Sequence, residues 1–387
     1  ISAGFVPMYY DDWIEDAYLD SIQDVLPFII ILAFIIPVCR MISQIVEEKE
    51  TKTKEMMSIM GLSGKAYWWS WISYYFIIYS IIALAATIIL GFTVYPYSNK
   101  LIILVTYLLF GICCIAFSLF ISVFFSRAKM ALTIGLMVFL GMFFLYFAVN
   151  DPVLPAGPKI ATSIFFPVAF AQSTYTLVEF EIGQAGVVFG NFTDEVFNYK
   201  YSTALFFLVL DATILFLLAL YFEQVWPTEF GVKKPWNFLF KKDFWKKPKP
   251  GEVTDFPEDV EYDDSVEPVE DVRLEQKADG RAMLVRGLTK KFQTTTAVDN
   301  LNLDIFEGEI FALLGHNGAG KTTTISMLTG LLPVTSGDMK VKNLLLSANL
   351  EEIRKLMGVC PQQNVLYKEL TPEEHLYLYS VFKGMTD

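Results

Sequence analysis

The sequence predicts a helical multi-pass membrane domain joined to the first part of an α/β domain. Of its 387 residues, 54% are hydrophobic and only 19% are charged, whereas a soluble domain has roughly a quarter charged residues. Nearly charge-free stretches fill the chain up to residue 225, and a glycine-rich loop between a predicted strand and a predicted helix follows near residue 315. This composition excludes a purely soluble or intrinsically disordered protein, and four cysteines are too few for a disulfide scaffold.

The chain is expected to be an internal part of a longer protein. It begins with Ile1 rather than methionine, and residues 1–24 are acidic and lack the basic start of a signal peptide. We interpret residues 1–24 as the end of an extracellular or lumenal region. The membrane domain then covers residues 25–225.

Five apolar stretches in this domain are each long enough to cross a bilayer, which requires about 20 apolar residues in a helix. Asp211, in the fifth stretch, must face the bundle interior or water, because a carboxylate in hydrocarbon is costly. It is either a substrate-path or proton-linked residue, or it forms a hydrogen bond between helices, and the sequence leaves these interpretations open. The predicted spanning helices are residues 25–46, 68–94, 101–126, 130–150 and 201–225.

Positive charges predict the orientation of these helices, because lysine and arginine mark cytoplasmic loops. Basic clusters occur within residues 47–65, 127–129 and 233–247. All three lie on the cytoplasmic side only if the apolar segment at 157–180 does not cross. We therefore expect 157–180 to be a re-entrant external hairpin whose backbone is covered by protein. The Asn-Phe-Thr triplet at 191–193 would then lie outside, where it could accept a glycan.

Two further segments connect the membrane domain to the rest of the chain. Residues 47–60 are charged on one face and too short to span, so we expect a helix at the cytoplasmic surface, either a simple connection or a lever. Residues 226–280 are expected to form a cytosolic linker. Its part 251–271 contains ten acids and no lysine or arginine, which accounts for −10 of the net charge of −12. Such a run is typical of a flexible linker, and nucleic acid is not expected as a partner.

Residues 281–387 have the composition of an α/β domain with a phosphate-binding loop. Strands are predicted at 284–292, 301–306 and 309–314, and a helix at 321–331. Between them the chain fits the pattern G-x-x-x-x-G-K-[ST], in which glycines let backbone N–H groups converge on phosphate oxygens. The candidate nucleotide-binding residues are Gly315, His316, Asn317, Gly318, Ala319, Gly320, Lys321, Thr322 and Thr323.

The residue types in this loop predict specific roles. The N-terminus of the following helix directs its positive dipole end at the phosphates. Lys321 is expected to bridge the β- and γ-phosphates, and the hydroxyl group of Thr322 to ligate Mg²⁺. The predicted ligands are therefore ATP and Mg²⁺.

Several motifs around the loop resemble those of ABC-type ATPases. The segment at 357–363, Met-Gly-Val-Cys-Pro-Gln-Gln, is similar to their Q-loop, and residues 370–376, Leu-Thr-Pro-Glu-Glu-His-Leu, are similar to the start of the following helix. The resemblance implies that Phe292 stacks on adenine. It also implies that Gln362 is a catalytic residue that reaches Mg²⁺ and the attacking water.

The membrane half resembles the A subfamily of ABC transporters. The similarity lies in residues 47–62, in Trp68 and Trp71, and in the run Tyr-Phe-Glu-Gln-Val-Trp-Pro at 221–227. It implies a type V exporter-like fold and an ATP-driven transporter that moves lipids or sterols between leaflets. It also implies that a second transporter half of the same polypeptide completes the ATP site.

The sequence also departs from this family. An L-S-G-G-Q signature, a strand ending in Asp-Glu and a switch histidine do not follow Gln362. We therefore expect a nucleotide-binding domain that is truncated before its signature motif, and a chain that by itself binds ATP without hydrolysing it. Two alternatives remain: a membrane-anchored nucleotide-binding scaffold that transports nothing, and an exporter of non-lipid cargo.

Overall fold

The computed structural model describes residues 17–226, 236–238, 256–257, 270–292, 295–360, 366–367 and 370–385. The chain forms two compact units. The helical unit comprises Ile1–Glu50 and Trp69–Glu223, and the α/β unit comprises Thr51–Trp68 and Gln224–Asp387. The predicted fold class, a multi-pass helical region followed by a partial α/β domain, is confirmed.

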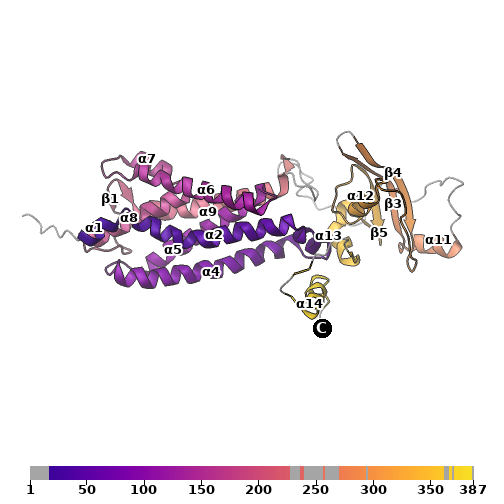
Figure 1. Cartoon of the computed structure of the whole chain (residues 1–387), viewed down its shortest axis with the longest axis horizontal. Helices are drawn as coiled ribbons and strands as arrows, with labels where there is room; N and C mark the ends of the chain where they lie inside the picture. The colour runs from indigo at the N-terminus through magenta and orange to yellow at the C-terminus, as the bar shows by residue number, and fades with distance from the viewer. Residues whose placement is uncertain are drawn as a thin grey trace, which may run out of the picture. The chain divides into compact units, whose positions relative to one another are not determined.

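Five helices of the helical unit are long and apolar enough to cross a membrane, and Figure 1 shows them running alongside one another. They agree with the five predicted spans to within a few residues at each end. Shorter helices and a two-stranded ribbon of β1 (Glu195–Val196) and β2 (Tyr199–Lys200) connect them. The helices are α1 (Ala17–Ile22), α2 (Leu26–Glu50), α4 (Gly64–Thr93), α5 (Lys100–Phe124), α6 (Ala128–Val149), α7 (Ala156–Thr162), α8 (Phe166–Ile182) and α9 (Tyr201–Val225).

Aromatic rings fill the centre of the helical unit around α5, the most buried of the five long helices. Phe110 of α5 stacks on Phe170 of α8 with ring centroids 4.0 Å apart, and Phe34 of α2 meets Phe110 edge-on at 5.1 Å. Such pairs add stabilisation beyond the area they bury. A close contact of α5 with α4 requires Gly111, since a Cβ there would lie 2.9 Å from the Cβ of Tyr79.

The segment at 157–180, predicted to be a re-entrant hairpin, forms the helix pair α7 and α8, and its depth in a membrane stays a prediction. The amide of Asn191, the predicted glycan acceptor, forms local hydrogen bonds: Nδ2 donates to the Gly186 carbonyl at 2.7 Å, and Oδ1 accepts from the Val188 N–H at 2.8 Å.

Asp211 is buried, as expected. Within the described part of the chain its Oδ2 atom has no hydrogen-bond partner, so its role stays open.

The C-terminal end of α2 joins three other helices. The ammonium group of Lys49 donates to the Ser122 carbonyl of α5 at 2.7 Å and lies 3.9 Å from the Glu223 carboxylate of α9. Glu50 accepts a hydrogen bond from the Ala128 N–H, the first amide of α6, at 3.0 Å. A carboxylate at this position satisfies a free amide and complements the helix dipole.

The prediction of one surface helix at 47–60 is wrong. α2 continues through Glu50, the chain turns at Lys52 with φ 60°, and a separate helix α3 (Thr53–Ile59) follows. The contacts of Lys49 and Glu50 with neighbouring helices extend α2 beyond the predicted span. α3 belongs to the α/β unit.

The α/β unit contains a four-stranded antiparallel sheet with strand order β4-β3-β5-β6. Its core is formed by Val285, Leu288, Met327, Met339 and Ile353, among others. The elements after α3 are α11 (Asp271–Ala278), β3 (Met283–Phe292), β4 (Thr295–Ile305), α12 (Lys321–Leu328), β5 (Ser336–Val341), β6 (Leu344–Leu345), α13 (Leu346–Leu356) and α14 (Pro372–Phe382). Most of the acidic stretch at 251–271 lies outside the described residues.

Two strand predictions differ from the structure. β4 begins at Thr295 rather than at residue 301, because it pairs with β3 as a hairpin from the Phe292–Thr295 pair onward. The strand predicted at 309–314 is absent: the backbone there pairs with no described strand, and Ile310 and Leu314 are 100% and 87% exposed. An apolar run alone predicts a strand, whereas a strand also needs a neighbour for its backbone hydrogen bonds.

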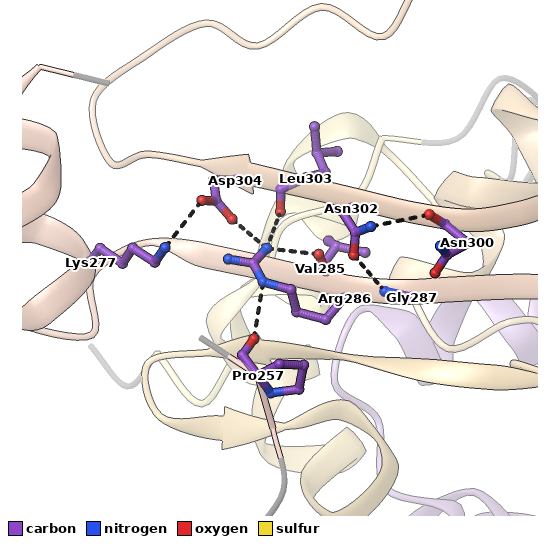
Figure 2. A network of polar contacts seen from close by, with 9 residues as sticks. All are labelled: Pro257, Lys277, Val285, Arg286, Gly287, Asn300, Asn302, Leu303 and Asp304. Carbon is purple, nitrogen blue, oxygen red and sulfur yellow. Dashed lines mark hydrogen bonds and ion pairs between the residues drawn. The ribbon is translucent and has the colours of Figure 1, made fainter. Parts of the chain in front are cut away.

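A buried ion pair fastens the β3–β4 hairpin (Figure 2). The guanidinium group of Arg286 is 2.5 Å from the carboxylate of Asp304 and also donates to the Pro257 carbonyl at 3.1 Å. The Arg286 and Asp304 side chains are 2% and 7% exposed. Lys277 of α11 lies 3.7 Å from the second carboxylate oxygen of Asp304. One pair thus connects two strands, a helix and the segment at 256–257.

Replacing Arg286 by methionine should lower the free energy of unfolding of the α/β unit by about 3–5 kcal/mol, because it leaves a buried carboxylate without its main partner. The double variant Arg286→Met/Asp304→Leu should recover most of this loss. Denaturant unfolding followed by amide exchange in β3 and β4 measures both values, with Lys291→Met, at an exposed site on β3, as the matched control. A single variant as stable as the double variant would contradict the assignment.

Candidate nucleotide-binding site

The predicted phosphate loop has a backbone that only glycine adopts without strain. Gly318 and Gly320 have φ values of 85° and 86°, in the left-handed region. α12 begins directly after Gly320, whose carbonyl accepts from the Thr324 N–H at 2.8 Å. A Cβ at Gly320 would lie 2.4 Å from the carbonyl oxygen of Ala297 in β4. The loop therefore packs directly against the β3–β4 hairpin.

Lys321, the first residue of α12, lies inside the loop. Its ammonium group donates to the carbonyl of His316 at 2.8 Å and to that of Gly315. Both acceptors are neutral backbone oxygens, so a phosphate would offer this charge a stronger partner. Thr322 and the loop residues 314–319 are exposed.

These features fit the binding of a nucleoside triphosphate. The loop combines left-handed glycines, a helix N-terminus, a cation and an accessible hydroxyl group, which together favour binding of phosphate. In the described ranges, no three His, Cys, Asp or Glu side chains gather as a metal site.

Phe292, the predicted adenine-stacking residue, ends β3 and is 43% exposed. The same hairpin brings Ala297 against Gly320, so it contributes both to the position of Phe292 and to the packing of the loop. The ammonium group of Lys290 lies 5.1 Å from the Phe292 ring and donates to the Pro333 carbonyl at 2.6 Å. Burial lowers the pKa of Lys290. An exposed ring in this place suits stacking on a planar base.

Gln362, the predicted catalytic and magnesium-binding residue, lies outside the described residues, and its role stays a prediction. The two histidines have local contacts: Nδ1 of His316 lies 2.8 Å from the Asn317 carbonyl, and the ring of His375 forms hydrogen bonds with Thr371 and Tyr367.

Sequence reasoning missed Arg354, which connects α12 to α3. A basic residue in the last turn of a helix was the one available signal.

Two family models match the chain. One, described as ABC-2 family transporter protein, matches residues 8–221, and one described as ABC transporter matches residues 298–386. The first covers more than half of the chain, and the second includes the whole phosphate loop.

The chain is also similar to curated proteins. It is 34% identical over 402 residues to the retinal-specific phospholipid-transporting ATPase ABCA4 of Bos taurus, a match that covers 97% of this chain and 17% of that protein. It is 33% identical over 388 residues to the ATP-binding cassette sub-family A member 7 of Rattus norvegicus, with the same coverage. It is 33% identical over 392 residues to the phospholipid-transporting ATPase ABCA3 of Homo sapiens, covering 97% of this chain and 23% of that protein. The chain thus spans only a small part of these relatives.

The two loop glycines provide a matched pair of variants. Gly318→Ala should cost roughly 1–2 kcal/mol of stability, because it forces a left-handed backbone on alanine. Gly320→Ala has the same backbone cost and adds a contact of 2.4 Å with Ala297, whereas a Cβ at Gly318 would meet nothing within 4 Å. Denaturant unfolding without nucleotide, followed by amide exchange in β4 and α12, should show the larger loss for Gly320→Ala. Equal losses would contradict the close packing of loop and hairpin.

Proposed function

Because the chain belongs to the ABC transporter family, in its A subfamily, we propose that it forms part of an ATP-driven transporter that moves lipids or sterols across a bilayer. The observation that carries the proposal is the combination, in one chain, of five apolar helices with a phosphate loop opening α12. Two of the relatives carry names that describe phospholipid transport. The apolar stretches contain no line of charged residues that would suit a hydrophilic cargo.

The proposed ligand of the loop is ATP with Mg²⁺. Lys321 would exchange its two carbonyl partners for phosphate oxygens, and backbone N–H groups at the start of α12 would hold the remaining oxygens. Phe292 would stack on the base. Thr322 and Gln362 would hold the metal, whose chemistry is to neutralise charge on the phosphates.

We place the α/β unit in the cytosol. Lys52 and Lys54 lie between α2 and α4, with Lys49 in the last turn of α2 and Lys65 near the start of α4, and Arg127 and Lys129 lie at the start of α6. Basic residues at these turns support the cytoplasmic side for both. α3, which belongs to the α/β unit, lies within the first of these basic segments.

Hydrolysis requires groups that the 387 residues do not include. No L-S-G-G-Q signature and no strand ending in Asp-Glu follows Gln362. We propose that a second transporter half of the same polypeptide completes the ATP site, and that this chain by itself binds ATP without hydrolysing it.

Binding is tested with a fluorescent ATP analogue and the purified chain. Lys321→Ala should weaken binding at least about tenfold, because charge-assisted hydrogen bonds to phosphate contribute roughly 1.5–3 kcal/mol. The control Lys355→Ala removes an exposed lysine of α13 and should leave binding unchanged. Equal binding by wild type and Lys321→Ala would contradict the site. Magnesium-dependent ATP hydrolysis by the chain that Lys321→Ala abolishes would contradict the binding-only state.

Transport is tested with the complete polypeptide in liposomes that contain a fluorescent phospholipid. ATP should change the share of the lipid that an external quencher reaches, and Lys321→Ala should reduce this change. ATP binding without movement of the lipid would favour the nucleotide-binding scaffold. Movement of a peptide or drug in its place would favour non-lipid cargo.

A further inference from the structure

Helix α3 is packed into the α/β unit although it lies in sequence between two membrane helices. Ile59 is 1% exposed and Met57 is 8% exposed. The hydroxyl group of Tyr367 donates to the sulfur of Met57 at 2.9 Å. Gly61, directly after α3, is held close to the end of α14, because a Cβ there would lie 2.7 Å from the Phe382 carbonyl oxygen. α3 therefore packs at a defined position within this unit.

The guanidinium group of Arg354 connects α3 to the C-terminal end of α12, the phosphate-binding helix. Nη1 of Arg354 donates to the hydroxyl oxygen of Ser58 in α3 at 2.8 Å. Nε and Nη2 of the same side chain donate to the carbonyls of Thr329 and Gly330 at 3.3 and 3.1 Å. These carbonyls directly follow α12, at the end where helical carbonyls lack partners within the helix.

The backbone of Arg354 is fixed in turn. Lys383, at the end of α14, donates to the Arg354 carbonyl at 2.9 Å and also to the Met357 carbonyl. Burial lowers the pKa of Arg354. The backbone that carries the Arg354 guanidinium group is therefore held in place by Lys383.

We propose that Arg354 is a positioning residue that transmits displacement of the phosphate-binding helix α12 to α3, and thereby to the chain that enters the membrane helices α2 and α4. The proposal rests on the proposed function, since it assumes that nucleotide binds at Lys321. α12 is eight residues long, so a shift at its N-terminal end is carried to the carbonyls of Thr329 and Gly330. The planar fork of Arg354 holds both carbonyls and Ser58 at once, and it moves with them.

The chemistry of arginine is essential to this role. A lysine ammonium at residue 354 would keep the charge and satisfy one carbonyl of α12, but it lacks a rigid fork that reaches three acceptors in different directions. Arg354→Lys therefore separates the link to α3 from the general stability of α13. Ser58→Ala removes the same link from the opposite side.

The experiment measures hydrogen exchange of the α3 amides in the full chain in nanodiscs, with and without saturating Mg·ATPγS. In the wild type, nucleotide should change this exchange by about fivefold or more, a typical coupling between sites. Arg354→Lys and Ser58→Ala should bind nucleotide within about threefold of the wild type and lose most of the change in α3. Lys355→Ala, one residue further along α13, should respond like the wild type.

The outcomes separate the two proposals. A change in α3 that persists in Arg354→Lys would overturn the role of Arg354, as would a wild type that binds nucleotide without any response in α3. A merely structural role would lower the thermal unfolding midpoint and be rescued by lysine. A wild type that binds no nucleotide would overturn both the transporter proposal and this one, and the affinity measurement identifies that case.

Discussion

The buried pair of Arg286 and Asp304 is the interaction on which the arrangement of the α/β unit depends. It fixes β3 against β4 at one end of the hairpin, and the opposite end of the same hairpin carries Phe292 and contacts the phosphate loop. Hydrogen bonds between strands alone tolerate slippage, but a charge pair in a water-poor position holds a single register because a slipped register would leave two charges without partners. The pair thus fixes the open end of the hairpin, while the pairing between it and the Phe292 end is irregular between Val285 and Lys291.

The stretch from the end of α2 to α3 is shared between the two units. Lys49 and Glu50 belong to α2 and contact α5, α6 and α9, whereas Met57 and Ser58, a few residues later, contact Tyr367 and Arg354. Between them the chain turns at Lys52 with a left-handed backbone. Each unit thus holds its own part of a short stretch, and the covalent chain between the two parts is only a few residues long.

The sequence was sufficient where a local pattern determines the structure. Long apolar runs defined five helices, and the spacing of Gly315, Gly320 and Lys321 located the loop and the start of α12. It failed where a partner distant in sequence decides the outcome. Residues 309–314 have the composition of a strand but lack a described neighbour, and α2 extends to Glu50 because of contacts with Ser122 and Ala128. The fork of Arg354 joins residues nearly 300 positions apart, a relation that no periodicity reveals.

The contact between Gly320 and Ala297 has a consequence for how this site can be recognised. A Cβ on this glycine would meet the backbone oxygen of Ala297 at 2.4 Å and the Cγ2 atom of Val298 at 3.2 Å, so the contact depends on the alignment of β4 with β3 and on the side chain at residue 298. One half of this interface is therefore a glycine motif that is visible in the sequence, and the other half is a strand position that is defined by the pairing of β4 with β3. A search for motifs detects the first half only, and two chains with the same loop can differ in whether their hairpin supports it.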